Sequence, residues 1–306
     1  MTPYRAPSWL PGGHLQTILP ALAPAPRVAW RRERWDTPDG DFVDVDRAGV
    51  GSGPLVALFH GLEGGSSSHY ARRLAAAALA RGWRLAVPHF RGCSGTLNRL
   101  PRAYHSGDSE EIDWMLRRLR PAYATGVSLG GNALLKWLGE RGDGARDVVT
   151  RAVAVSAPLS LTASARVLDA GLNRRLYVRH FLLTMKAKAI AKVALGQLAL
   201  DQFRIAGMRT FREFDELITA PLHGFRGAED YWARASSAPW LARIRVPTLV
   251  LNARNDPFLA AADLAAATRE VSGDVVLEFP ETGGHAGFPG REDWLAHRIL
   301  GFLAIS

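Results

Sequence analysis

Gly126-Val127-Ser128-Leu129-Gly130 places a serine between two glycines, and the residues on both sides have the character of a strand-to-helix junction. Residues 122–125 are short and apolar enough for a buried strand, and residues 131–138 repeat apolar side chains at helical spacing. The glycines would let the strand and the helix approach closely, which leaves the serine Oγ exposed at the carboxyl end of a sheet. This pattern predicts a nucleophile elbow with Ser128 as the catalytic nucleophile.

Two further residues complete the expected catalytic group. A serine hydroxyl is a weak nucleophile at neutral pH, so it needs a histidine base and a carboxylate that orients the histidine. Asp256 lies on a turn after the apolar stretch 246–253, and His285 lies in a glycine-rich loop after the stretch 275–279. Taken singly, Asp256 is typical of a turn before proline and His285 of a surface loop. Their order and their positions at strand ends together predict a Ser128–His285–Asp256 triad.

The loop His60-Gly61-Leu62-Glu63-Gly64-Gly65-Ser66 is the candidate for stabilising the reaction's negative charge. It follows the apolar stretch 55–59 and precedes an expected helix that begins near Ser68. Acyl transfer needs hydrogen-bond donors where charge develops on the substrate carbonyl oxygen. The backbone N–H groups of Leu62 and Leu129 are the expected donors of this oxyanion hole. The alternative is an ordinary flexible loop.

The apolar stretches predict an α/β protein with a parallel core. The expected core strands are residues 55–60, 84–89, 122–127, 151–156, 247–253 and 274–279. Residues 28–49, with a turn at 36–40, have the pattern of an antiparallel hairpin.

The interval 158–242 interrupts this rhythm, since it is too long for a simple crossover and its pattern is largely helical. We therefore expect a core of residues 1–157 and 243–306, with residues 158–242 as a mainly helical cap. A cap in this position would cover the substrate pocket and select the acyl or alcohol part. The candidate pocket residues are His60, Gly61, Glu63, Leu176, Phe181 and Phe214.

Several stretches resemble the α/β-hydrolase superfamily and, more narrowly, its type-4 group of YheT-like esterases and lipid-ester hydrolases. They are Gly13-His14-Leu15-Gln16-Thr17, His60-Gly61-Leu62-Glu63-Gly64, Phe90-Arg91-Gly92-Cys93-Ser94-Gly95, Tyr104-His105-Ser106-Gly107-Asp108 and Pro221-Leu222-His223-Gly224-Phe225. The resemblance implies an α/β-hydrolase fold with a mostly parallel central sheet, helices on both faces and a helical cap. It also implies that Ser128, Asp256 and His285 are nucleophile, acid and base.

This chain departs from the group at two positions. The group often has two adjacent aspartates before the proline, whereas this chain has Asn255-Asp256, which leaves Asp256 as the acid. Glu63 stands where a small polar residue is commoner, so a carboxylate is expected close to the oxyanion loop.

The first functional hypothesis is hydrolysis of carboxylic esters through an acyl-enzyme, in the manner of esterases and lipases. The resemblance implies a small-molecule ester with an apolar acyl group. Transfer of the acyl group to an alcohol or thiol would use the same triad, and a non-catalytic ligand-binding protein of the same fold is the third possibility. No cofactor or metal is expected, because no histidine pair has a recognised zinc-ligand spacing.

Composition agrees with one α/β domain, since 306 residues with 47% hydrophobic content can bury a full core. The single cysteine, Cys93, excludes an internal disulfide and is expected to be structural. The first residues lack a signal-peptide pattern, and no apolar run approaches the ~20 residues of a membrane span, so a cytoplasmic location is expected.

The formal net charge of +9 does not indicate nucleic-acid binding, because the basic residues are dispersed arginines without a basic tract or stacking motif. Residues 174–192 are the exception, since basic and apolar residues mix there at helical spacing. This segment fits either peripheral contact with an anionic membrane surface or a helix with one buried and one solvated face. No oligomeric state is predicted.

Overall fold

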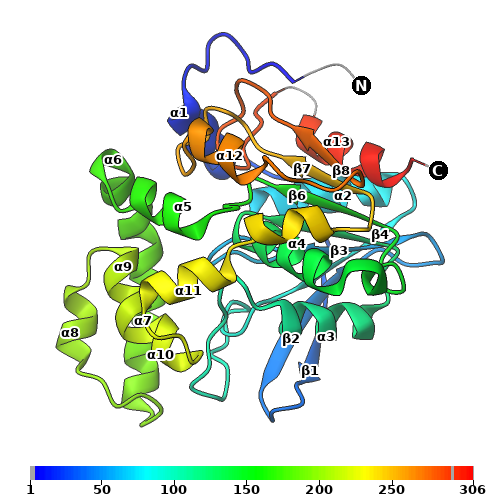
Figure 1. Ribbon diagram of the computed structural model, residues 1–306. Coiled ribbons are helices and arrows are strands. Elements are labelled where there is room, and N and C mark those ends of the chain that lie inside the picture. The colour runs from blue at the N-terminus through cyan, green and yellow to red at the C-terminus, as the bar shows by residue number, and fades with distance from the viewer. Residues whose placement is uncertain (1–3, 291–292, 306) are drawn as a thin grey trace.

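The computed structural model describes residues 4–290 and 293–305. Its centre is an eight-stranded sheet with the order β1-β2-β4-β3-β5-β6-β7-β8 (Figure 1). The strands are β1 (Arg31–Asp36), β2 (Phe42–Ala48), β3 (Leu55–Phe59), β4 (Arg84–Pro88), β5 (Tyr123–Val127), β6 (Arg151–Val155), β7 (Thr248–Leu251) and β8 (Val275–Glu278). Strands β3 to β8 pair in parallel, whereas β2 pairs antiparallel with both β1 and β4. The predicted α/β fold with a mostly parallel sheet is confirmed.

Helices cover both faces of this sheet. One face packs against α2 (His69–Ala80) and α13 (Trp294–Leu303). The other packs against α3 (Ser109–Leu119), α4 (Leu129–Arg141), a 3₁₀ turn at Gly142–Ala145, and α12 (Ala261–Ala267). Because successive residues of a strand point to opposite faces, β3 contributes side chains to both layers and is buried along its whole length. Continuous apolar strands are therefore what this core requires.

The crevice for a ligand follows from the strand order. Strand β3 lies between β4 and β5, so the chain goes from β3 to its neighbour β4 on one side and later enters β5 on the other side of β3. The loops that follow β3 and β5 diverge at this switch point, outside the carboxyl ends of the strands. The glycine-rich loop 60–66 follows β3, and Ser128 follows β5, so both lie at these two neighbouring strand ends.

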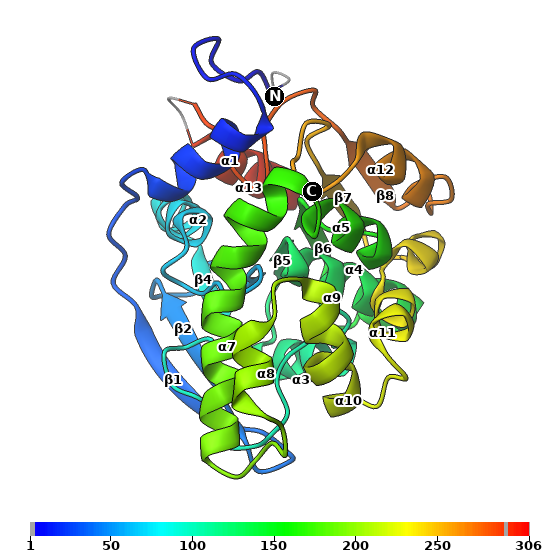
Figure 2. The same cartoon turned by 90° about the vertical axis from the view of Figure 1, so that its left-hand side faces the viewer.

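The stretch between β6 and β7 is largely helical (Figure 2). The α-helices are α5 (Leu161–Leu168), α6 (Gly171–Asn173), α7 (Arg179–Ala194), α8 (Gln202–Gly207), α9 (Phe211–Phe214), α10 (Ala220–Leu222) and α11 (Ala228–Ala235). Two π-helical turns, Arg174–Val178 and Asp215–Thr219, and a 3₁₀ helix, Ala238–Arg243, complete it. Figure 1 shows α6 to α10 on one side of the sheet, where they form a separate layer.

The chain begins with α1 (Gly13–Leu22), which contacts α2 and the loops beyond β7 and β8. Among residues 4–290 and 293–305, no helix is both long enough and apolar enough to cross a membrane.

Candidate active site

Ser128 lies between β5 and α4 with a φ angle of 54°, in the left-handed region that non-glycine residues seldom adopt. The two elements approach so closely that a Cβ on Gly126 would lie 2.4 Å from the Gly130 carbonyl oxygen. A Cβ on Gly130 would lie 2.4 Å from the Phe59 carbonyl oxygen. Both glycines are therefore required by close backbone packing, and the strained turn presents the Ser128 side chain to the pocket.

Ser128, His285 and Asp256 form a continuous hydrogen-bonded line. His285 Nε2 lies 2.9 Å from Ser128 Oγ, and His285 Nδ1 lies 2.8 Å from Asp256 Oδ2. These distances allow Ser128 to donate to one imidazole nitrogen while the other nitrogen donates to the carboxylate. The structure thus brings together the three residues that are far apart in the sequence.

Asp256 and Phe258 orient the histidine. The Asp256 side chain is fully buried, and its second oxygen, Oδ1, accepts a hydrogen bond of 2.8 Å from the Phe258 N–H. The Phe258 ring stacks on the imidazole of His285, with ring centroids 3.9 Å apart. Phe258 was missed in the sequence, because a phenylalanine two residues after the acid carries no recognisable pattern.

Leu62 and Leu129 line the same pocket as Ser128 and His285. Within the described residues, neither backbone N–H has an internal hydrogen-bond acceptor. The loop is held against the elbow, since a Cβ on Gly61 would lie 3.2 Å from the Ser128 Cβ and the Gly61 N–H donates to the Tyr70 hydroxyl. Both leucine N–H groups therefore remain available to an oxygen atom in the pocket.

Glu63 joins the glycine-rich loop to α7. Its carboxylate lies 2.8 Å from Lys188 Nζ and accepts a hydrogen bond of 2.7 Å from the Tyr104 hydroxyl. The Glu63 N–H also donates to that hydroxyl, and the residue has a φ angle of 56°. The unusual glutamate is thus a fixed contact between the two layers.

The pocket has a volume of about 160 Å³ and is lined mainly by apolar side chains. Of the candidate lining residues, Glu63, Phe181 and Phe214 lie on its wall. The other apolar lining residues include Leu62, Leu97, Leu161, Leu168, Met185, Phe211, Ile218, Leu222, Trp232 and Phe258.

The expectation that His60, Gly61 and Leu176 line the pocket does not hold. His60 is completely buried: its Nδ1 lies 2.7 Å from the Gly61 carbonyl oxygen, and its Nε2 accepts from the Phe90 N–H. Burial lowers the pKa of His60 to about 3, so the ring is neutral. Gly61 faces the elbow through its backbone, as described above. Leu176 is 42% exposed, because the π-helical turn Arg174–Val178 directs its neighbour Tyr177 inwards instead.

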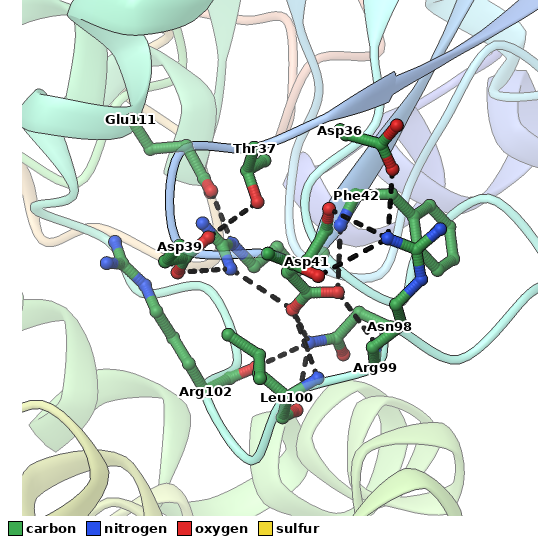
Figure 3. Close-up of polar contacts among 12 residues, drawn as sticks. Asp36, Thr37, Asp39, Asp41, Phe42, Asn98, Arg99, Leu100, Arg102 and Glu111 are labelled. Atoms are coloured by element: carbon green, nitrogen blue, oxygen red, sulfur yellow. Dashed lines mark hydrogen bonds and ion pairs between the residues drawn. The ribbon is translucent and has the colours of Figure 1, made fainter.

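The loop that brings Leu97 and Asn98 to the pocket is fixed by one buried aspartate, Asp41 (Figure 3). Its carboxylate accepts hydrogen bonds from the Asn98 side chain at 2.6 Å and from the Arg99 N–H at 2.7 Å. It also accepts from the Leu100 N–H and forms an ion pair with Arg91. These donors compensate the burial of the charge and hold one wall of the pocket in place.

Cys93 lies beside Lys188, with Sγ 3.5 Å from Nζ. Burial raises the pKa of the Cys93 thiol to about 12, so little thiolate forms at neutral pH. This fits the structural role expected for the residue. Across the described ranges, no group of three or more His, Cys, Asp or Glu side chains has the arrangement of a metal site.

Three polar residues that hold the His285 loop were also missed. Gln16 and Thr17 of α1 and Ser156 after β6 accept hydrogen bonds from its backbone. The only sequence feature that pointed to Gln16 and Thr17 was the stretch Gly13-His14-Leu15-Gln16-Thr17. It contributed to the family resemblance, but no chemical role was assigned to it.

Comparisons with known proteins agree with this architecture. A family model described as the alpha/beta hydrolase fold matches residues 54–291. "Putative esterase YheT" of Escherichia coli (strain K12) is 40% identical, over 95% of this chain and 89% of that protein. "Monoacylglycerol lipase" of Saccharomyces cerevisiae is 30% identical, over 90% of this chain and 63% of that protein. The structure of mouse alpha/beta hydrolase domain-containing protein 10 covers 89% of this chain and 98% of its own, with a TM-score of 0.59; at 13% identity it shows the fold alone.

Proposed function

The chain belongs to the α/β-hydrolase fold family, as a YheT-like member, and we propose that it is a serine hydrolase that cleaves carboxylic esters. The observation that carries the proposal is the line of hydrogen bonds from Asp256 through His285 to Ser128, at 2.8 and 2.9 Å. The relatives named as an esterase and a lipase support ester hydrolysis as the reaction class.

The reaction begins when Ser128 Oγ attacks the ester carbonyl carbon and its proton passes to His285 Nε2. The tetrahedral intermediate collapses as the imidazolium returns this proton to the leaving alcohol, which leaves an acyl group on Ser128. A water molecule then attacks the acyl-enzyme with His285 as base, which releases the acid and restores the serine. Asp256 accepts the hydrogen bond from Nδ1 throughout and stabilises the imidazolium.

Leu62 and Leu129 are proposed as the oxyanion donors. Both residues line the same pocket as Ser128 and, within the described chain, their N–H groups have no internal acceptor. An oxyanion between them would receive two hydrogen bonds only when charge develops, which lowers the barrier.

The substrate is proposed to carry an apolar acyl group, because most of the pocket wall is apolar. We assign residues 158–242 to a cap, since helices from this stretch supply Phe181, Phe214 and other wall residues opposite the sheet. The cap would therefore select the acyl chain, while the core carries the chemistry.

Peripheral contact with an anionic lipid surface is a further part of the proposal. Leu172, Leu176 and Leu183 are exposed near the start of α7, at 53%, 42% and 63%. Arg174, Arg175 and Arg179 are exposed beside them, and no acidic residue occurs from residue 170 to residue 200. Apolar side chains mixed with positive charge are typical of helices that lie on anionic lipid.

Vesicle sedimentation tests this contact. The protein should sediment with vesicles that contain phosphatidylglycerol more than with pure phosphatidylcholine vesicles, and added salt should weaken the binding. Reversal of charge in Arg174→Glu/Arg175→Glu should abolish the difference. Equal sedimentation of this variant and the wild type would contradict a lipid contact at this surface.

A series of p-nitrophenyl esters of increasing acyl length tests the catalytic proposal. Ser128→Ala should lose about 10⁶-fold in kcat while the fold is retained. A fluorophosphonate should label the wild type at Ser128 and leave the variant unlabelled. Retained turnover in Ser128→Ala would refute the nucleophile assignment.

A further inference from the structure

Four consecutive backbone N–H groups in the His285 loop donate to side chains, each to a different residue. The donors belong to Gly283, Gly284, His285 and Ala286. The respective acceptors are Gln16 Oε1 at 2.8 Å, Asn255 Oδ1 at 3.1 Å, Thr17 Oγ1 at 2.8 Å and Ser156 Oγ at 2.9 Å. Two of the four acceptors lie on α1, which is more than 260 residues earlier in the chain.

The backbone of this loop is strained and needs such support. Ala286 and Phe288 have φ angles of 52° and 42°, in the left-handed region that is unfavourable for residues with a Cβ. Such conformations cost about 1–3 kcal/mol each and persist only where the surroundings hold them. Without its acceptors, the loop would relax and carry the imidazole away from Ser128.

Helix α1 has its polar side turned inwards. Gln16 and Thr17 are buried, whereas Leu15, Leu19 and Leu22 are exposed. A surface helix normally buries its apolar residues. The reversed arrangement is explained by the hydrogen bonds that its inner side makes.

Gln16 uses its whole amide group in these contacts. Oε1 accepts from the Gly283 N–H and from Asn255 Nδ2, and Nε2 donates to the Leu10 carbonyl at 2.8 Å. Helix α1 and the histidine loop approach so closely that a Cβ on Gly287 would lie 1.8 Å from the Gln16 carbonyl oxygen. The backbones of α1 and the histidine loop are therefore in direct contact.

A second path leads from α1 to the imidazole through aromatic rings. His14 Nδ1 lies 3.0 Å from the Tyr177 hydroxyl. The Tyr177 ring packs edge-on against Phe258, with centroids 4.6 Å apart, and Phe258 stacks on His285. Helix α1 thus contacts the backbone of the loop directly, and it reaches the ring that covers the imidazole through Tyr177.

We propose that Gln16 and Thr17 are positioning residues, which hold His285 between Asp256 and Ser128 without touching the substrate. This proposal rests on the catalytic role proposed for the triad. Their loss should slow the chemical step and leave substrate binding unchanged, because neither side chain lines the pocket.

Thr17→Val provides the test, since valine has nearly the shape of threonine but cannot accept the His285 N–H. With a p-nitrophenyl ester we expect kcat to fall about 10²-fold, as for a misplaced catalytic group, and KM to change less than about threefold. The rate of fluorophosphonate labelling should fall in parallel. Thr17→Ser, which keeps the hydroxyl, should restore kcat to within about threefold of the wild type.

Leu22→Ala is the matched control, because it alters an exposed residue of α1 and should leave kcat unchanged. Circular dichroism and thermal unfolding verify that each variant is folded. If Thr17→Val does not fold, Gln16→Ala replaces it, with the same expected fall in kcat at nearly unchanged KM.

A folded Thr17→Val with wild-type kcat, or one in which only KM rises, would overturn the positioning role. So would a Thr17→Ser variant as impaired as Thr17→Val. These outcomes differ from failure of the catalytic proposal, which would appear as turnover in Ser128→Ala whatever the behaviour of Thr17.

Discussion

The sheet and the helical stretch between β6 and β7 both reach the pocket, but they fix their residues differently. Ser128, Asp256 and His285 lie on turns after strands and are held by hydrogen bonds of defined length. The helical stretch contributes mainly packed apolar side chains, such as Phe181 and Phe214.

Under the proposed function, this difference would assign the chemistry to the hydrogen-bonded residues and the choice of acyl group to the helical stretch. Hydrogen bonds fix direction and distance, so substitutions around the triad should lower kcat. Apolar contacts depend on volume rather than direction, so substitutions in the helical stretch should change which acyl chain is accepted. Glu63 and Lys188 connect the two regions.

Asp256→Asn should have the largest effect and should act on the chemistry alone. The Phe258 N–H requires an oxygen, so the amide would turn its NH₂ towards His285 Nδ1 and favour the wrong tautomer. We expect kcat to fall about 10⁴-fold at nearly unchanged KM. Steady-state kinetics measure this, with the exposed Asp263→Asn as control. A loss below about tenfold would contradict the role of Asp256.

Phe214→Trp should change selection without changing the chemistry. The larger ring would fill part of the apolar pocket, so kcat/KM for long acyl chains should fall about 10- to 100-fold while short esters are hardly affected. The p-nitrophenyl ester series measures the ratio of kcat/KM for long acyl chains to kcat/KM for short ones. Phe203→Trp is the control, because Phe203 is 77% exposed. Equal losses for all chain lengths would mean that this helical stretch does not select the acyl group.

Lys188→Met should weaken the connection between the two regions. It leaves the buried carboxylate of Glu63 without its cation, which should lower the free energy of unfolding by about 2 kcal/mol. The double variant Glu63→Gln/Lys188→Met should recover most of this loss. Urea unfolding of the two single variants and the double variant measures the coupling. If the loss in the double variant equalled the sum of the losses in the two single variants, the ion pair would contribute nothing to the free energy of unfolding.

Asp215→Asn should have the smallest effect, confined to the helical stretch and dependent on pH. Burial raises the pKa of Asp215 to about 7, so the native carboxyl keeps a proton that the unfolded chain has already released. Stability therefore falls as pH rises through the native pKa, by about 1 kcal/mol between pH 6 and pH 7. The amide of Asp215→Asn would mimic the protonated carboxyl, so this slope should disappear in the variant. Urea unfolding of the wild type and the variant at pH 6 and pH 7 measures this difference in stability. If the variant lost as much stability as the wild type between the two pH values, the raised pKa of Asp215 would be contradicted.

Much of the core could be predicted from local pattern. Residues 55–59 and 152–155 are continuous apolar runs, which only a strand covered on both faces requires, and the predicted hairpin at 28–49 is present as β1 and β2. The same reasoning suggested Ser128, because a glycine-flanked serine at a strand-to-helix junction is a local feature.

The pocket could not be predicted in the same way. Leu176 was expected on its wall and is exposed, because a π-helical turn changes which residues of a helix face inwards. Phe258 covers the histidine although its sequence position suggests nothing, since the contact depends on where two separate loops meet.

By itself, the sequence determined the strands, the elbow and the order of serine, aspartate and histidine, because each depends on neighbouring residues and on the apolar continuity of a buried strand. Only the tertiary structure decided that Gln16 and Thr17 accept hydrogen bonds from the His285 loop, and which helical side chains line the pocket. These contacts join segments that are distant in the chain, and their geometry is set by the packing of whole elements rather than by local sequence.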